Sequence, residues 1–216
     1  IIRLEHVDAG YPGAVILNDV SFAVARGEIF ILLGGSGCGK STVMKHMTGL
    51  NPILAGRLTV AGLAWSAATR AELSRQIGVM YQSGALFGSM TCLENVRLPL
   101  DEFSDLSKAA RRARALELLR DVELEDAADK MPSEISGGMR KRVAIARAMA
   151  LDPSVVFLDE PSAGLDPITS AALDDLILRL RAEKGMAFVV VTHELPSVFK
   201  IGDRAAMFDR ARHGLV

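Results

Sequence analysis

A glycine-rich stretch near the N-terminus constrains the fold of this chain more than any other feature. It consists of Gly34, Gly35, Ser36, Gly37, Cys38, Gly39, Lys40, Ser41 and Thr42. These residues fit the phosphate-binding pattern G-x-x-x-x-G-K-S/T, in which backbone N–H groups turn toward a polyphosphate. The apolar run 29–33 precedes the stretch and a helix-like segment, 43–50, follows it. Strand, loop and helix in this order are the context that the pattern requires, so we predict a site for nucleotide phosphates.

Two side chains of this loop are expected to have specific roles. Lys40 can reach the terminal phosphates, and the Ser41 hydroxyl can ligate Mg²⁺. The N-terminus of the following helix adds a partial positive charge. The alternative is a glycine-rich turn with a chance lysine, but it leaves the flanking strand and helix unexplained. Cys38 is interpreted as a small residue within the loop.

Composition limits the class of protein. The 216 residues are half hydrophobic, which suits one large domain or a domain with a subdomain. A net charge of -1 lacks the basic excess of a nucleic-acid binder, so we expect no nucleic-acid partner. Cys38 and Cys92 fit a reducing compartment, and no apolar run approaches the roughly 20 residues of a membrane span. There is no signal peptide. The chain opens at Ile1 without a methionine and ends directly after a strand-like segment, which is consistent with a missing natural start and a shortened C-terminal end.

Hydrophobic periodicity predicts strands that alternate with helices. We expect strands over 1–7, 20–25, 29–33, 57–62, 77–81, 155–159, 187–192 and 205–208. Helices are expected over 43–50, 107–122, 136–150, 168–183 and 195–200, and one more begins at a capping box of Thr91 and Glu94. Continuous apolar strands between helices indicate a parallel sheet covered on both faces. The alternation in 20–25 is typical of a half-buried antiparallel strand. We therefore predict an α/β core of residues 1–82 and 153–216, with a helical insertion over 83–152. Within the insertion, Arg111, Arg112 and Arg114 are expected to form a solvated face or to contact a partner.

An acidic pair follows one of the buried strands. Asp159 is placed to hold Mg²⁺, directly or through water, because ligands bind beyond the carboxyl ends of parallel strands. Glu160 can act as the general base on the attacking water, a role that contributes about 10²–10⁴-fold in rate. The alternative, a solvated acidic pair, is disfavoured beside a phosphate loop. His193 and Gln82 also end strands. We expect His193 to donate to a terminal phosphate, and Gln82 to ligate the metal or orient water.

Two further features have ordinary alternatives. Ser136, Gly137 and Gly138 open a helix with small residues, which exposes N–H groups and predicts a second anion site. A simple helix cap by Ser133 or Ser136 is the alternative. The ring of Tyr11 can stack on a purine or pack within its turn.

Together these motifs resemble the ATP-binding subunits of ABC transporters over essentially the whole chain. The shared features are the phosphate loop, Gln82, the signature 135–139, the acidic strand 155–160, the D-loop 162–166 and His193, in the family order. The resemblance implies a P-loop NTPase core with a mainly parallel sheet, an N-terminal antiparallel β subdomain, and a helical subdomain carrying the signature. It implies ATP and Mg²⁺ as ligands, with Tyr11 stacking on adenine. The signature departs from the family's usual Leu-Ser-Gly-Gly-Gln at Ile135 and Met139, and the D-loop has Ala163 where many members have serine.

The resemblance also implies partners and a mechanism. Lys40, Glu160 and His193 would be catalytic, and Ser41, Gln82 and Asp159 would hold the metal. A second copy of the chain would close Ser136, Gly137 and Gly138 over the nucleotide, and an integral membrane permease would receive the motion at the cytoplasmic face of the inner membrane.

A narrower resemblance concerns the transported substrate. Residues 81–87, the Ser-Gly-Gly-Met signature and the loop 33–41 look like those of Mla/Mce-type lipid transport ATPases. This implies that the chain powers transport of a hydrophobic molecule, expected to be phospholipid, between bacterial membranes. The alternatives are the ATPase of an importer or exporter for another substrate, and a soluble ABC-type ATPase acting on ribosomes or DNA. A nucleotide-binding regulator without turnover is disfavoured by Glu160 and His193.

Overall fold

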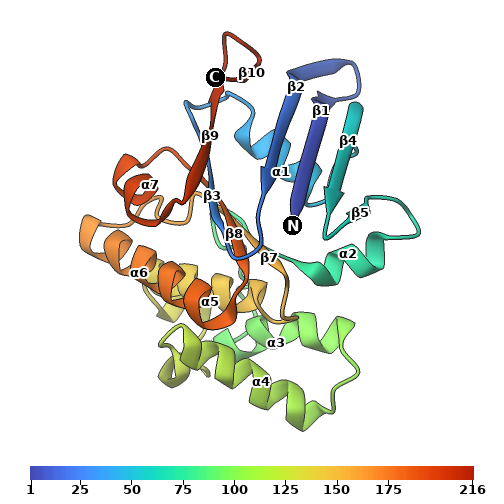
Figure 1. Ribbon diagram of the computed structural model, residues 1–216. Helices are drawn as coiled ribbons and strands as arrows, with labels where there is room; N and C mark the ends of the chain where they lie inside the picture. Colours follow the sequence, from blue (N-terminus) through green and yellow to red (C-terminus); the bar gives the residue numbers. More distant parts are fainter.

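A six-stranded sheet forms the centre of the molecule. The computed structural model describes all residues, 1–216. The sheet runs in the order β10-β9-β3-β8-β7-β6, and all neighbours are parallel except β10 and β9. Its strands are β3 (Ile29–Gly34), β6 (Ile77–Met80), β7 (Val155–Asp159), β8 (Ala187–Thr192), β9 (Arg204–Asp209) and β10 (Gly214–Leu215). The predicted mainly parallel sheet is confirmed (Figure 1).

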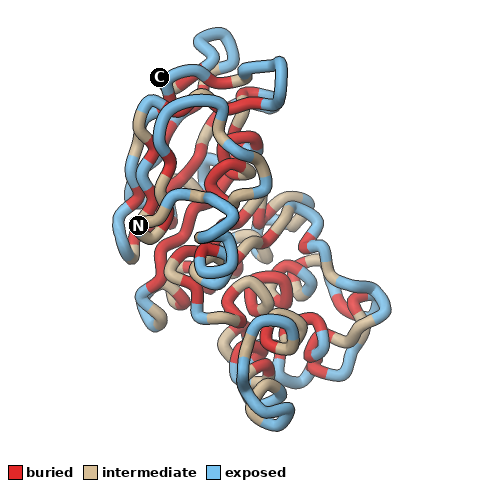
Figure 2. The backbone as a smooth tube through the Cα atoms, turned by 90° about the vertical axis from the view of Figure 1, so that its right-hand side faces the viewer, coloured by how far each residue is buried: buried red, intermediate tan, exposed pale blue.

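Both faces of this sheet are covered, as continuous apolar strands require. Alternate residues of a strand point to opposite faces. Ile29 and Ile31 accordingly belong to a core shared with the helices α3 to α7, whereas Phe30 and Leu32 belong to a second core shared with α1 (Lys40–Met47) and the N-terminal strands. Figure 2 shows buried segments running through the interior of the molecule, with exposed residues gathered at the loops and ends.

The second core lies beneath a four-stranded antiparallel sheet. Its order is β2-β1-β4-β5. The strands are β1 (Ile2–Tyr11), β2 (Ala14–Val24), β4 (Ala55–Val60) and β5 (Leu63–Ala64), and α2 (Arg70–Gln76) follows them. Buried His46 joins this sheet to α1, because its Nε2 accepts from the Gly10 N–H at 3.0 Å and its Nδ1 donates to the Asn51 carbonyl at 3.1 Å. The expected antiparallel β subdomain is therefore present.

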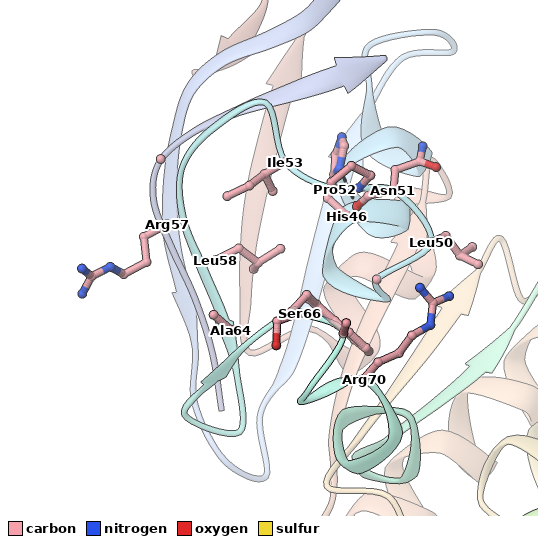
Figure 3. Close-up of a pocket in the computed structure, with 14 residues that line it drawn as sticks. His46, Leu50, Asn51, Pro52, Ile53, Arg57, Leu58, Ala64, Ser66 and Arg70 are labelled. Carbon is pink, nitrogen blue, oxygen red and sulfur yellow. Dashed lines mark hydrogen bonds between the residues drawn. The ribbon is translucent and has the colours of Figure 1, made fainter. Parts of the chain in front are cut away.

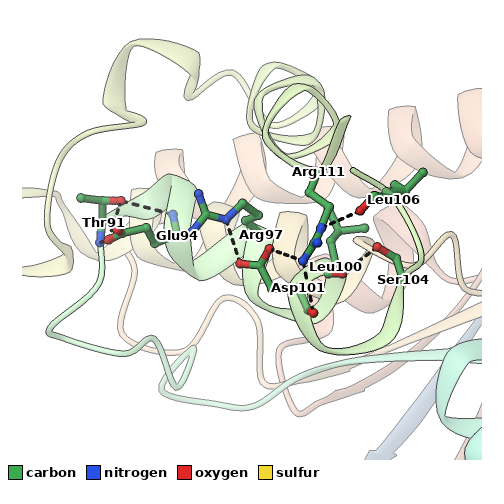
Figure 4. Close-up of polar contacts among 8 residues, drawn as sticks. All are labelled: Thr91, Glu94, Arg97, Leu100, Asp101, Ser104, Leu106 and Arg111. Atoms are coloured by element: carbon green, nitrogen blue, oxygen red, sulfur yellow. Dashed lines mark hydrogen bonds and ion pairs between the residues drawn. The ribbon is translucent and has the colours of Figure 1, made fainter. Parts of the chain in front are cut away.

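The remaining helices pack on the other face. They are α3 (Cys92–Phe103), α4 (Lys108–Asp121), α5 (Gly137–Ala148), α6 (Pro167–Lys184) and α7 (Leu195–Ile201), with short 3₁₀ turns at Glu125–Ala127 and Pro132–Glu134. The predicted capping box is confirmed at α3: the Glu94 N–H donates to Thr91 Oγ1 at 3.2 Å, and the Thr91 N–H donates to Glu94 Oε2 at 2.8 Å (Figure 4). The division of the chain into core and helical subdomain remains a prediction.

One prediction for α4 was wrong in part. Arg111 and Arg114 do not form a solvated face, because their side chains are only 26% and 19% exposed and are ion-paired. Arg111 bridges to Asp101 of α3 at 3.0 Å, and Arg97 pairs with the same carboxylate at 2.8 Å (Figure 4). Arg112 is exposed, as expected.

Several boundaries also differ from the predictions. The helix after the phosphate loop begins at Lys40 rather than residue 43, because Gly39, with φ 101°, caps it directly. It ends before Gly49, whose φ of 70° lies in the left-handed region. The signature helix ends at Ala148 rather than residue 150. The elements β5, α2 and β10 were not predicted.

An ion pair between buried Glu28 and exposed Arg204, near the start of β3, gives a pH-dependent contribution to stability. The Glu28 carboxylate accepts from Arg204 at 2.5 and 2.9 Å and from the Ala25 N–H at 2.5 Å. The bonds from Arg204 hold the pKa of Glu28 below its usual value of 4.5. A depressed pKa in the folded state contributes stability above the unfolded pKa, and this contribution disappears as the pH falls through the folded pKa.

We therefore expect Glu28→Gln to lower the free energy of unfolding by about 1 kcal/mol at neutral pH, since Arg204 is partly solvated. The difference from wild type should shrink as the pH falls below about 4.5. Urea unfolding at several pH values measures both effects. A difference that is the same at neutral and acidic pH would contradict this assignment.

Candidate active site

The carboxyl ends of four adjacent strands bring the predicted residues to one edge of the sheet. The strand registers pair Leu33 with Thr192, Asp159 with Val191, and Met80 with Leu158. The segments that leave these strands therefore emerge next to one another. They carry the phosphate loop, His193, the acidic pair and Gln82. These residues come from places far apart in the sequence, and the strand order β3-β8-β7-β6 collects them.

The phosphate loop ends at a helix terminus with free donors. No side chain caps α1. The N–H groups of Lys40, Ser41 and Thr42 have no acceptor in the protein, since the first bond of this turn runs from the Val43 N–H to the Gly39 carbonyl. Unpaired N–H groups and the helix dipole make such a terminus a binding site for anions. The geometry fits a polyphosphate.

The side chain of Lys40 folds back onto the start of this loop. It is buried, and Nζ donates to the carbonyls of Gly34 at 2.6 Å and Gly35 at 3.0 Å. Gly34 has φ 153°, and a Cβ there would lie 2.5 Å from the Phe208 carbonyl oxygen. A side chain at Gly34 would therefore displace the loop. Cys38 is buried against it, which agrees with the interpretation of Cys38 as a small packing residue.

The acidic pair lies at the end of β7. Burial and the neighbouring Glu160 charge raise the pKa of Asp159, while Lys40 and Lys141 oppose that shift. Glu160 Oε1 lies 2.9 Å from His193 Nδ1, and Glu160 Oε2 is buried without a hydrogen-bond partner. Glu160 also has φ 47°, a conformation that is strained for a residue with a side chain and is typical of functional sites.

The oxygen ligands at this edge of the sheet suit a magnesium ion. Mg²⁺ is usually bound by one or two carboxylates together with phosphate oxygens and waters. Asp159 offers the carboxylate, and the exposed Ser41 and Gln82 offer a hydroxyl and an amide. There is no group of three or more His, Cys, Asp or Glu side chains that could form an all-protein cage. Ser41, Gln82 and Asp159 thus remain the proposed ligands, and Glu160 Oε2 has no hydrogen-bond partner in the protein.

Tyr11 lies beside the phosphate-loop helix. It ends β1 and is 40% exposed. Lys45 of α1 donates to its hydroxyl at 3.3 Å and lies 5.8 Å from the ring centroid. The ring is therefore held near α1 with part of its surface free, as stacking on a base requires.

The signature residues are not joined to the phosphate loop within this chain. Ser136 caps α5 by accepting from the Met139 N–H at 3.2 Å, so the simple cap is present. Gly138 packs so closely on α6 that a Cβ would lie 2.6 Å from Thr169 Cγ2. No hydrogen bond links Ser136, Gly137 or Gly138 to the phosphate loop. Buried Ile135 and half-buried Met139 contribute to the hydrophobic core.

One residue at the site was not predicted. Lys141 of α5 is buried, and its Nζ donates to the carbonyls of Gln82 and, at 3.2 Å, Glu160. Burial lowers the pKa of Lys141. Its basic neighbours are different, since Arg140 is exposed and Arg142 is half-buried, so charge alone could not distinguish Lys141 in the sequence.

A separate cavity lies at the opposite end of α1. It has a volume of about 510 Å³ and is lined by the end of that helix, by β4 and by the segment around Trp65 (Figure 3). Trp65 donates from its indole nitrogen to the Met47 carbonyl at 3.0 Å. None of the predicted nucleotide or metal residues lines this cavity.

Comparison with known sequences agrees with this geometry. A sequence profile of the family described as ABC transporter matches residues 17–163. The glutamate/aspartate import ATP-binding protein GltL of Escherichia coli is 36% identical over 214 residues, or 98% of this chain and 88% of that protein. The methionine import ATP-binding protein MetN of Bradyrhizobium diazoefficiens is 39% identical over 218 residues. The match covers 97% of this chain but 63% of MetN, so the chain spans less than two thirds of that relative.

Solved structures give the same result. The dimeric ATP-binding cassette MJ0796 bound to ADP and Pi superposes with a TM-score of 0.88 at 31% identity, covering 100% of this chain and 96% of that one. The cbiO1 protein of Clostridium perfringens, part of the ABC transporter complex cbiONQ, gives a TM-score of 0.92 at 27% identity and covers 100% and 86%. No helix of this chain is both long and apolar enough to cross a membrane.

Proposed function

Since this chain belongs to the ABC transporter family of ATP-binding proteins, we propose that it is the ATP-hydrolysing subunit of an importer for a small polar solute of the amino acid class. Members of this family are ATPases that use ATP with Mg²⁺. The observation that carries ATP hydrolysis is the shared sheet edge, where the loop with Lys40 and the Glu160–His193 pair follow neighbouring strands. The importer class is supported by the names of the relatives.

The side chains at this edge have distinct roles in hydrolysis. Lys40 and the free N–H groups of the loop bind the phosphates and stabilise the negative charge of the transition state. Ser41, Gln82 and Asp159 would hold Mg²⁺, which would neutralise negative charge on the phosphate oxygens. Glu160 takes a proton from the attacking water as the general base; its Oε2 has no hydrogen-bond partner in the protein. His193 holds the other carboxylate oxygen and so fixes the direction of the base.

The partners are a second copy of the chain and an integral membrane permease. Ser136, Gly137 and Gly138 of one copy would close over the phosphates held by the other, and a two-fold axis would generate two such sites. The separation of the signature from the phosphate loop within one chain supports this arrangement. So does the likeness to a cassette that is dimeric with ADP and Pi. Tyr11 would stack on the adenine ring.

The substrate class differs from the lipid expected from residues 81–87. The relatives reported above are named as importers of glutamate and aspartate and of methionine, which favours an amino acid and gives no support to phospholipid. We place the chain at the cytoplasmic face of the inner membrane, held there by its permease.

Uptake measurements in a strain that lacks this gene test the proposal. We expect the wild-type gene to restore uptake of radiolabelled amino acids, glutamate and methionine among them, and Glu160→Gln to leave uptake at the level of the deletion strain. Phospholipid exchange between the two membranes is measured in the same cells. Normal amino acid uptake in the deletion strain together with altered phospholipid exchange would refute the importer proposal and favour the lipid alternative.

A further inference from the structure

Two cationic side chains of α5, Lys141 and Arg147, hold the loop that carries Gln82. Arg147 donates to the carbonyls of Gly84 and Ala85, both at 2.7 Å, and Lys141 donates to the carbonyl of Gln82. We propose that Lys141 and Arg147 are positioning residues that make the loop 82–85 move with the signature helix, and that Lys141 transmits this position to Glu160. The inference rests on the function proposed above.

The two cations lie along one ridge of α5. Residues three apart are neighbours on a helix surface, so Lys141, Ala144 and Arg147 form a continuous row. Gly84 lies over the middle of this row, because a Cβ built on it would be 3.5 Å from Ala144 Cβ. The small Ala144 lets the loop backbone approach closely, and the longer side chains on either side reach its carbonyls. Residues 82–85 thus contact α5 from Lys141 to Arg147.

Neither cation has a carboxylate partner within ion-pair distance, in contrast to Arg97, Arg111 and Arg114 on the neighbouring helices. Burial of a charge that has no ion-pair partner is unfavourable. Burial lowers the pKa of both groups. A neutral donor would satisfy the same carbonyls with less desolvation, so stability alone does not account for these residues.

The far end of the loop is fixed to the helices as well. Buried Asn95 of α3 accepts from the Phe87 N–H at 2.8 Å and donates to the Phe87 carbonyl at 3.1 Å. Unlike Arg147 and Asn95, Lys141 also donates to the Glu160 carbonyl, at 3.2 Å. Movement of α5 would therefore shift both Gln82 and the backbone that carries the general base. The carboxylate of Glu160 is correctly aimed only when α5 is in place.

Lys141→Met tests the link to Glu160. We expect kcat for ATP hydrolysis to fall about tenfold, with KM for ATP changed by no more than about twofold, because the phosphate loop is untouched. Lys141→Gln keeps a donor that is one bond shorter and should recover part of the lost kcat. Unchanged kcat in Lys141→Met, or equal loss in the Met and Gln variants, would overturn the positioning role.

Arg147→Met tests the attachment of the loop without reference to activity. We expect amide hydrogen exchange in residues 84–87 to rise about tenfold, because local opening becomes easier when the carbonyls lose their donor. Arg147→Lys should give an intermediate rate, since one ammonium cannot reproduce the planar fork. Exchange at the wild-type rate in Arg147→Met would contradict the inference.

Two controls separate this inference from the proposed function. Arg120→Met removes a cation of α4 whose side chain is 64% exposed and paired with Glu125, and it should leave kcat and loop exchange unchanged. Wild type and Glu160→Gln are assayed beside these variants. If wild type hydrolyses ATP, Glu160→Gln does not, and the Lys141 and Arg147 variants behave as wild type, the function stands and the inference fails. If wild type has no ATPase activity, the function fails.

Discussion

Glu160→Gln is expected to abolish ATP turnover while leaving nucleotide binding intact. The amide has the shape of the carboxylate but cannot accept a proton from water, and loss of a general base lowers the rate by about 10²–10⁴-fold. Lys40, the free N–H groups of α1 and Asp159 are unchanged, so affinity for MgATP should stay close to that of wild type. Because hydrolysis no longer separates the two copies, ATP-bound dimers should accumulate.

Steady-state ATPase assays and size-exclusion chromatography with and without ATP measure these effects. Glu183→Gln on α6 is the matched control, since its side chain is 49% exposed and lies only within weak ion-pair distance of Arg179, at 4.0 Å. It should hydrolyse ATP normally and show no excess of dimer. Near-normal hydrolysis by Glu160→Gln would remove Glu160 from the role of base.

Lys40→Ala is expected to lose most nucleotide affinity. Removing one partner of a buried charge contact costs about 2–5 kcal/mol, which corresponds to at least about thirtyfold in the dissociation constant. The Gly34 and Gly35 carbonyls would also lose the donor that holds the loop in shape. Turnover should fall with binding, unlike in the Glu160 variant.

Titration with a fluorescent ATP analogue or calorimetry measures this loss. Lys108→Ala, at the exposed start of α4, serves as a control with the same substitution. A melting temperature for each variant shows whether reduced binding reflects unfolding. Unchanged affinity in a folded Lys40→Ala variant would refute the assignment of the phosphate loop.

Local patterns predicted the larger elements well. The strands β7 and β8 lie where the sequence indicated, and so do the capping box of α3 and the Ser136 cap of α5. The helix α4 agrees with its predicted range to within one residue at each end. The elements β5 and β10 were missed because two residues carry no detectable period. In α2 only Leu73 is buried, so its hydrophobic pattern is too weak to read.

Charged residues were harder to interpret than apolar ones. Arg111 and Arg114 share a helix face that looks solvated in sequence, yet α3 and the segment before β7 supply carboxylates that form ion pairs with them. Lys141 looks like its basic neighbours, yet α5 turns it toward the carbonyls of Gln82 and Glu160. Whether a cation is buried depends on what packs against it, and those groups are distant in sequence.

The phosphate loop illustrates what the sequence alone determined. Its glycines, Lys40 and Ser41 specify a phosphate site because strand, loop and helix are consecutive in the chain. Only the tertiary structure decided which residues join that loop. Pairing of β3 with β8 and of β8 with β7 brings His193 against Glu160, whereas Ser136 has no hydrogen bond to the loop. These contacts depend on strand order and on helix burial, which form between residues far apart in the chain.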